Sequence, residues 1–230
     1  KIRTLGSESE AKTRDRSGRG MPARVSHHRL AGASASCAAL GFVAEQREKR
    51  METETLETIE IAHDGGIDWL TLNRPKSRNA INGQMAKELR DYFWRLQDHT
   101  KTRIVVMRGA GESFCAGLDL KAGATGRITD SEGREPVGRG FGFQGFLADV
   151  SVLMRRCPQP IVSLVQGNAC GGGFAFVLAS DIRIAAENAR MNAAFIKIGL
   201  SACDMGTSYF LPRLVGTSLA SELMPVSYTH

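Results

Sequence analysis

The pattern of apolar and polar positions divides the chain into an irregular N-terminal part and a patterned remainder. Residues 1–50 show no sustained apolar period and are rich in Arg, Ser, Ala and Gly, which predicts a disordered leader or transit-like segment. From Met51 onward, short β-branched runs alternate with stretches whose apolar residues recur at helical spacing. This alternation predicts an α/β domain over residues 51–224, followed by a short tail at residues 225–230.

The predicted elements follow from the period of each apolar run and from the turn signals beside it. Asp64-Gly65-Gly66 separates two strand-like runs, which predicts a hairpin, and Asn82 stands at the N-cap position of an amphipathic helix. Six glycines in residues 123–142 predict a long loop. In chain order, the predicted elements are strands 56–63 and 67–73, helix 83–98, strand 103–108, helix 143–156, strand 161–166, helix 174–179, strands 181–185 and 190–195, and helices 205–214 and 214–224.

Charge and cysteine content narrow the classes of function. The formal net charge of +6 comes from residues 1–50, which hold 11 Lys and Arg against 5 Asp and Glu, whereas residues 51–230 hold 19 of each. A nucleic-acid-binding face on the patterned part therefore has no support from net charge. The five cysteines show no C-x-x-C pair and no metal-ligand spacing, which favours free thiols and predicts no metal site. No apolar run approaches the roughly 18 residues that a membrane span needs.

The leader has a composition that bears on location. Residues 21–43 contain Arg24 and Arg29 but no acidic residue, which is typical of an organelle transit peptide and predicts a mitochondrial protein. The alternative is linker or untranslated sequence read in frame, with the start at Met51. That alternative leaves a cytoplasmic or peroxisomal location open.

Two segments rich in small residues come directly after predicted strands. In residues 113–120, SFCAGLDL, small side chains let a ligand approach the backbone closely, and Asp119 can cap the turn that comes after it. Residues 166–173, QGNACGGG, join a strand to a helix, and such a junction directs unpaired N–H groups and the positive end of the helix dipole at one point. Taken singly, the first segment is accounted for by a tight turn. The second can hold an anion or a developing oxyanion.

Together, these two segments resemble the crotonase superfamily, also called the enoyl-CoA hydratase/isomerase family. Four further pieces agree in order and spacing, namely NRP with RNAI at 73–81, RIVVMRG at 103–109, PIV at 160–162 and ASDIR at 179–183. The resemblance covers residues 56–224 and implies the family's α/β spiral of repeated ββα units, with the C-terminal helical part truncated here. It also implies a homo-oligomer, a trimer or hexamer, in the full-length form.

The resemblance assigns roles to individual residues. The backbone N–H groups of Leu118 and Gly172 would form an oxyanion hole for the carbonyl oxygen of an acyl-CoA thioester, where one donor can lower the barrier by about 3 kcal/mol. No cofactor is implied beyond the coenzyme A moiety of that substrate. The residues expected to cradle the CoA are Lys76, Arg78, Asn79, Ala80, Ala116, Gly117, Asp119 and Leu120.

The residues available for proton transfer favour isomerisation. The family's hydratases position a water with two glutamates, and the matching positions here hold Ala175 and Phe195, neither of which can move a proton. Asp204, in the segment GLSACDMGT, resembles the acid/base aspartate of dienoyl-CoA isomerases. One carboxylate can take a proton from one carbon of an enolate and return it to another. Double-bond isomerisation of an enoyl- or dienoyl-CoA is therefore the favoured prediction.

Several alternatives stay open at this point. Asp204 can serve as a helix N-cap, or as a nucleophile like that of some dehalogenases in the superfamily. The chain can also be a hydratase or another lyase or hydrolase of the crotonase type, or a catalytically silent subunit that binds CoA esters. Glu88 and Asp91 are predicted to be solvated charges on an exposed helix face.

Overall fold

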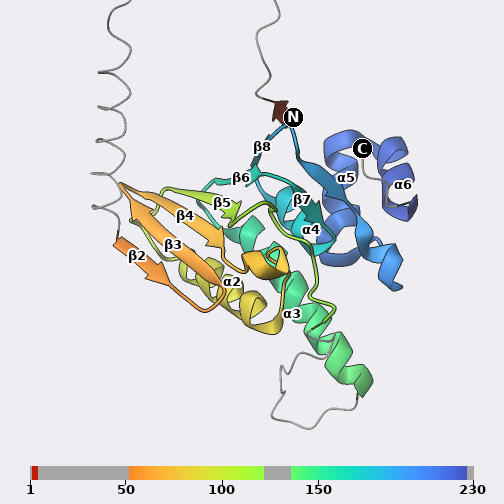
Figure 1. Ribbon diagram of the computed structural model, residues 1–230, viewed down its shortest axis with the longest axis horizontal. Coiled ribbons are helices and arrows are strands. Elements are labelled where there is room, and N and C mark those ends of the chain that lie inside the picture. The colour runs from red at the N-terminus through yellow and green to blue at the C-terminus, as the bar shows by residue number, and fades with distance from the viewer. Residues whose placement is uncertain (1, 5–51, 122–135, 227–230) are drawn as a thin grey trace, which may run out of the picture. The chain divides into compact units, whose positions relative to one another are not determined.

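The protein is described here by a computed structural model that covers residues 2–4, 52–121 and 136–226. Its main sheet has seven strands in the spatial order β1-β8-β6-β5-β4-β3-β2 (Figure 1). These strands are, in the same order, Ile2–Thr4, Ile182–Ala185, Ile161–Val165, Ile104–Gly109, Ile67–Leu72, Ile59–Asp64 and Glu52–Thr55. The pairs from β4 to β1 are parallel, and the pairs β2–β3 and β3–β4 are antiparallel.

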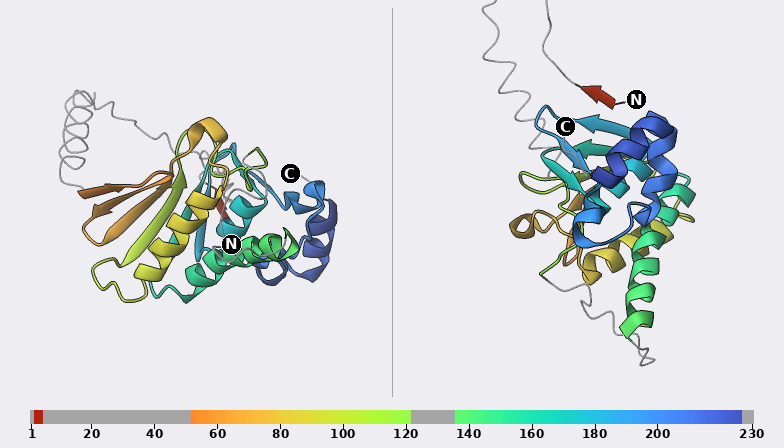
Figure 2. Two further views of the ribbon diagram at one scale, coloured as in Figure 1. Left: turned by 90° about the horizontal axis from the view of Figure 1, so that it is seen from below. Right: turned by 90° about the vertical axis from the view of Figure 1, so that its right-hand side faces the viewer.

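A second, smaller sheet and the helices complete the described part of the chain. The strands β7 (Asn168–Cys170) and β9 (Arg190–Asn192) pair in parallel. The helices are α2 (Gly83–Arg95), α3 (Pro136–Arg156), α4 (Gly172–Ala179), α5 (Thr207–Val215) and α6 (Thr217–Val226), with 3-10 turns η1 (Pro75–Ser77), η2 (Ala194–Ile198) and η3 (Asp204–Gly206). Figure 2 shows α2 and α3 beside each other and α5 packed against α6. The α/β prediction is confirmed.

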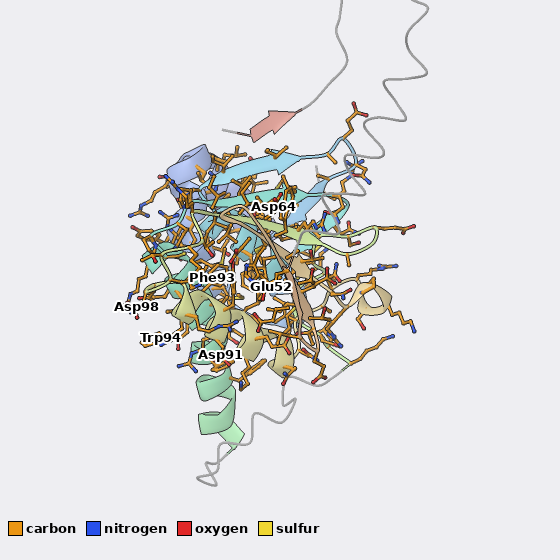
Figure 3. The ribbon with its side chains drawn as sticks, turned by 90° about the vertical axis from the view of Figure 1, so that its left-hand side faces the viewer. Glu52, Asp64, Asp91, Phe93, Trp94 and Asp98 are labelled. Atoms are coloured by element: carbon orange, nitrogen blue, oxygen red, sulfur yellow. The ribbon has the colours of Figure 1, made fainter. Side chains whose placement is uncertain are left out.

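Helix α2 shows how the apolar period places a helix on the sheet. The side chain of Asn82 caps the helix by accepting a hydrogen bond from the N–H of Met85 at 2.9 Å, as its N-cap position predicts. Phe93 is fully buried in the core, whereas the next residue, Trp94, is 64% exposed (Figure 3). Neighbouring residues on a helix point about 100° apart, so one apolar face packs on the sheet while the other side meets solvent.

Glu88 is not the solvated charge that the sequence predicted. It is only 6% exposed, and its carboxylate accepts hydrogen bonds from the backbone N–H groups of Glu57 at 3.1 Å and Thr58 at 3.0 Å. These two amides precede β3 and would otherwise lack a partner, which explains why a carboxylate is buried there. Asp91 is exposed as predicted and pairs with Lys87 at 2.7 Å.

Several boundaries differ from the predicted ones. Helix α3 begins at Pro136, seven residues before the predicted start, because proline suits the first turn of a helix where no N–H partner is needed. Strand β9 ends at Asn192, and the next residues form η2 instead of continuing as a strand. The strands β1, β2 and β7 were not predicted, since their sequences, IRT, ETET and NAC, contain no run of large apolar residues. Apart from β1, the predicted leader lies outside the described residues.

No helix in the described ranges has both the length and the apolar character required to cross a membrane.

Candidate active site

The two segments singled out in the sequence converge on one cavity. Leu118 and Gly172 both line a cavity of about 130 Å³. Leu118 follows strand β5 through a short loop, and Gly172 is the first residue of α4. Because β7 leads into α4, the arrangement depends on how the loop after β5 is held against β7.

Backbone hydrogen bonds hold that loop on both sides. The N–H of Cys115 donates to the carbonyl of Asn168, and the N–H of Cys170 donates to the carbonyl of Cys115, each at 2.9 Å. On the other side, the N–H of Ile81 donates to the carbonyl of Gly117 at 2.7 Å. The loop thus behaves as a short extra strand between residue 81 and β7, which fixes the direction of its amides.

Two glycines are required where the loop and α4 approach each other. Gly117 has a φ of +89°, and a Cβ there would lie 2.7 Å from the carbonyl oxygen of Cys170. A Cβ on Gly173 would lie 2.4 Å from the carbonyl oxygen of Cys115. Any side chain at either position would push the two segments apart, which explains the small residues in both sequence motifs.

The amides at the cavity are free to bind a ligand. Gly171 precedes α4 with a φ of +50°, and no side chain caps the start of this helix. Among the described residues, the N–H groups of Leu118 and Gly172 donate to no acceptor. Unpaired N–H groups beside the positive end of a helix dipole favour an oxygen that carries negative charge.

Asp204 lines the same cavity. The carboxylate is half-buried, and burial raises its pKa above the ordinary value of 3.8, opposed by hydrogen bonds from the Gln144 side chain and from the N–H of Met205 at 2.8 Å. Met205 has a left-handed φ of +50°, which is unusual for a side chain of its size. The strained turn η3 holds Asp204 at the cavity wall, next to the residue that packs on Gly172.

The two positions that carry glutamates in the family's hydratases differ from each other in placement. Phe195 lies on η2 and lines the cavity. Ala175 lies in the second turn of α4, is fully buried, and is not among the lining residues. At these two positions, the cavity wall therefore contains an aromatic ring from Phe195 and no side chain from Ala175.

The residues expected to cradle CoA fall into three groups. Ala116, Gly117 and Leu120 line the cavity, and Leu120 is mostly exposed. Lys76 and Arg78 are exposed at η1, where their charges can meet phosphates.

The remaining three are largely buried. Ala80 has little exposed surface, and Asp119 is an ion-pair partner of Arg74 at 2.8 Å that also accepts the N–H of Lys121 at 3.1 Å, which confirms its predicted capping role. Asn79 has no exposed surface, so its side chain can act only by holding the loop in place. Its amide nitrogen donates to the carbonyl oxygens of Ala110, Ser113 and Phe114.

Sequence reasoning missed two polar residues at the cavity, Gln144 on α3 and Lys197 on η2. Gln144 lies three residues before Leu147, which also lines the cavity, so the helical period of α3 is the signal that could have found it. No comparable pattern marks Lys197.

The chain is similar to known proteins of one family. A family model for enoyl-CoA hydratase/isomerase matches residues 62–228. A Mycobacterium leprae protein named "Probable enoyl-CoA hydratase echA12" is 39% identical over 155 residues, and a carnitinyl-CoA dehydratase of Escherichia coli is 32% identical over 169 residues. The alignments cover 67% and 73% of this chain, and 52% and 60% of the respective relatives.

A solved structure gives the same fold. The crystal structure of an enoyl-CoA hydratase/isomerase from Mycobacterium paratuberculosis superposes with a TM-score of 0.67 at 29% identity, covering 76% of this chain and 68% of that one. The predicted crotonase-like fold is therefore confirmed. The chain spans about half the length of the Mycobacterium leprae relative, 52%. On the family match and these similarities, the chain belongs to the enoyl-CoA hydratase/isomerase family, or crotonase superfamily.

Proposed function

We propose that this chain binds an acyl-CoA thioester and moves a carbon–carbon double bond of its acyl group. The thioester oxygen accepts hydrogen bonds from the N–H groups of Leu118 and Gly172, and Asp204 is the acid and base. The observation that carries the proposal is that these three residues line one cavity, with both amides unpaired among the described residues.

The chemistry needs one proton carrier and one electron sink. The Asp204 carboxylate takes a proton from the carbon next to the thioester carbonyl, and the electron pair moves onto the carbonyl oxygen to give an enolate. The two N–H groups stabilise that oxygen as its charge develops. The carboxylic acid then returns the same proton to the far end of the former double bond, and the electron pair moves back. Atoms and charge balance without a further reactant.

The surroundings of Asp204 suit this role. Burial raises the pKa of its carboxyl group, and a carboxylate with a raised pKa is a stronger base than an ordinary aspartate. Gln144 donates a hydrogen bond to the carboxylate and lines the same cavity, which orients the base toward a bound ligand.

A second candidate is a catalytically silent subunit that binds CoA esters. The specific observation in its favour is the pair Ala175 and Phe195, which leaves Asp204 as the only carboxylate among the described residues that line the cavity. The same pair argues against hydration, because a bound water would lack the two acidic groups that position it in the family's hydratases. The names of the relatives quoted above support the CoA-ester class of ligand.

Incubation of the purified chain with 3-enoyl-, 2-enoyl- and dienoyl-CoA tests the proposal. We expect double-bond migration in at least one substrate, and Asp204→Asn to lower its rate by about a hundredfold or more while thioester binding persists. Asp98→Asn is the matched control, since Asp98 is an exposed aspartate on another part of the surface (Figure 3). Binding without any product would favour the silent subunit, and an unchanged rate in Asp204→Asn would remove this residue from the mechanism.

A further inference from the structure

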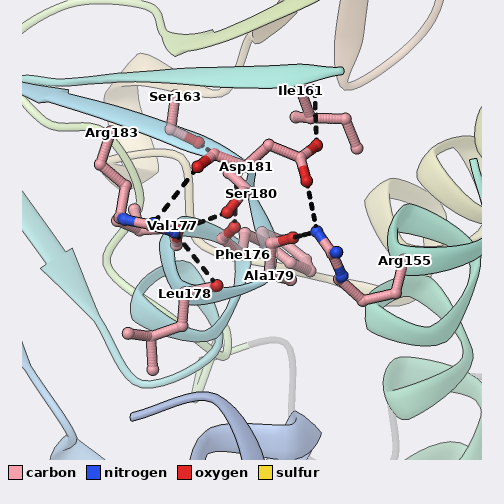
Figure 4. A network of polar contacts seen from close by, with 10 residues as sticks. All are labelled: Arg155, Ile161, Ser163, Phe176, Val177, Leu178, Ala179, Ser180, Asp181 and Arg183. Atoms are coloured by element: carbon pink, nitrogen blue, oxygen red, sulfur yellow. Dashed lines mark hydrogen bonds and ion pairs between the residues drawn. The ribbon is translucent and has the colours of Figure 1, made fainter. Parts of the chain in front are cut away.

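The two ends of helix α4 differ in how many of their backbone groups are hydrogen-bonded. At the N-terminal end, which faces the cavity, no side chain caps the helix. At the C-terminal end, each of the last four carbonyl oxygens accepts a hydrogen bond (Figure 4). Helix termini ordinarily leave four such groups unsatisfied, so the contrast within one helix of eight residues calls for a physical account.

Two arginines supply most of the donors at that end. Arg183, on β8, donates to the carbonyl oxygens of Val177 and Leu178 at 3.4 Å and to that of Ser180 at 2.5 Å. Arg155, at the end of α3, donates to the carbonyl oxygen of Ala179 at 3.1 Å. The carbonyl oxygen that remains, at residue 176, accepts from the hydroxyl of Ser180 at 2.9 Å.

The residues that bind the C-terminal end of α4 are also hydrogen-bonded to the main sheet. Asp181 accepts from Arg155 at 2.7 Å and from the N–H of Ile161 on β6 at 2.9 Å. The hydroxyl of Ser163, also on β6, lies 2.6 Å from that of Ser180. The end of α4 is therefore joined to α3, β6 and β8 at one point, as Figure 4 shows.

Burial strengthens the electrostatic interaction between the Arg183 charge and the dipole of α4. All eight residues of α4 are buried, so the dipoles of its peptide groups are poorly screened by water. Arg183 itself is only 7% exposed, and burial lowers the pKa of its guanidinium, yet it has no carboxylate within hydrogen-bonding distance among the described residues. Its positive charge is compensated by the carbonyl oxygens at the negative end of α4 and, without a direct contact, by the negative charge of Asp181, which acts to raise the pKa of the guanidinium.

We propose that Arg183 is a positioning residue for the oxyanion hole. It holds the C-terminal end of α4 in place, so that the N-terminal end at Gly172 faces the thioester oxygen. It also neutralises the negative end of the helix, which leaves the positive end unopposed. Arg155 assists at the carbonyl of Ala179. This inference rests on the proposed function, because it concerns the same carbonyl oxygen. It differs from a purely structural role, since it requires the polarisation of a bound thioester to depend on a residue at the opposite end of the helix.

The test uses a chromophoric conjugated thioester, cinnamoyl-CoA, whose absorption moves to longer wavelength when its carbonyl is polarised. We expect Arg183→Met to reduce this shift. On the enoyl-CoA substrate that the wild-type chain isomerises, the same variant should lower kcat about tenfold, with less than about a threefold change in KM. Arg183→Lys keeps the charge without the planar fork and should recover part of both. Arg156→Met is the matched control, because Arg156 ends the same helix as Arg155 but makes no hydrogen bond or ion pair with any described residue.

The possible results distinguish a failure of the proposed oxyanion hole from a failure of the positioning role of Arg183. If the wild-type chain produces no shift, the oxyanion hole itself is absent, and the proposed function falls together with this inference. If the wild-type shift is present and Arg183→Met retains the full shift and rate, the positioning role alone is overturned. Should Arg183→Met fail to fold, Arg155→Met carries the test, because Arg155 is exposed and its removal frees one carbonyl oxygen of α4 and one ion pair with Asp181.

Discussion

The sulfur atom of Met205 lies against the backbone of Gly172, so that a methyl group added to Gly172 would come within 3.0 Å of it. The same methyl group would lie 2.8 Å from the Cδ1 atom of Ile81. Both neighbours line the cavity. The residue after the candidate base thus packs on the candidate oxyanion hole, and the two parts of the site cannot shift independently.

We predict that Gly172→Ala lowers kcat/KM by about a hundredfold while the fold survives, because displacing a reacting group by about 1 Å can have that effect. The atoms that the methyl group meets are the ends of flexible side chains, so the free energy of unfolding should change by less than about 1 kcal/mol. Steady-state kinetics and urea unfolding check the two parts. Gly145→Ala is the control, since Gly145 lies on an exposed face of α3 with open space around it. Wild-type activity in Gly172→Ala would contradict the assigned geometry.

We predict that Asp204→Asn raises the melting temperature at neutral pH although it lowers the rate of isomerisation. Burial raises the pKa of Asp204, so the folded state binds the proton more tightly than the unfolded state. The stability linked to this proton is fully present below pH 3.8 and is lost as the pH rises through the folded pKa. Asparagine does not ionise, so the variant avoids this loss of stability at neutral pH.

Thermal melts of both proteins between pH 3 and pH 8 measure the difference. The gain in the variant should be largest at neutral pH and should shrink as the pH falls toward the ordinary pKa of aspartate, 3.8. The activity of the wild type should rise with pH over the same window, because only the carboxylate is a base. A variant that is less stable than the wild type at neutral pH would show that the ionised carboxylate of Asp204 mainly stabilises its own turn, through the hydrogen bond from the N–H of Met205.

Asn79 offers a test of how the CoA-facing loop is built. Its amide nitrogen reaches three carbonyl oxygens, and its amide oxygen accepts from the N–H of Arg74 at 2.9 Å. We predict that Asn79→Ala destabilises the chain by about 3 kcal/mol, because buried polar groups would lose their partners. Urea unfolding measures this, and Ser77→Ala, on the exposed turn nearby, should change stability by less than about 0.5 kcal/mol. Equal effects at both positions would argue against the loop-holding role.

The sequence was informative where local chemistry decides the structure. The N-cap of α2, the β-branched run of β5 and the glycine-rich junction before α4 depend on residues close together in the chain, and all three were predicted. Glu88 was misplaced because its partner amides lie 30 and 31 positions away. The buried position of Asn79 likewise depends on carbonyl groups about 31 to 35 positions along the chain, beyond the reach of any local period.

Asp68 is a buried carboxylate remote from the candidate site, and its partners make it a sensitive test of the antiparallel end of the sheet. It accepts from the hydroxyls of Tyr92 and Thr102, each at 3.0 Å, and one of its oxygens lies 2.8 Å from Nδ1 of His63. Burial, followed by the negative charge of Asp68, raises the pKa of Tyr92 well above its ordinary value of 10.0. Tyr92 should therefore keep its proton as long as the chain stays folded.

We predict that Tyr92→Phe destabilises the chain by about 2 kcal/mol, since a buried carboxylate loses one charged hydrogen bond. The raised pKa also means that the stability linked to the Tyr92 proton is present below pH 10.0 and is lost as the pH rises above it, because only the unfolded state ionises there. Alkaline titration followed by tyrosinate absorbance should show Tyr92 ionising only together with unfolding. Tyr209→Phe is the control, because the Tyr209 side chain is exposed on α5. Ionisation of Tyr92 in the folded chain near pH 10 would contradict its burial against Asp68.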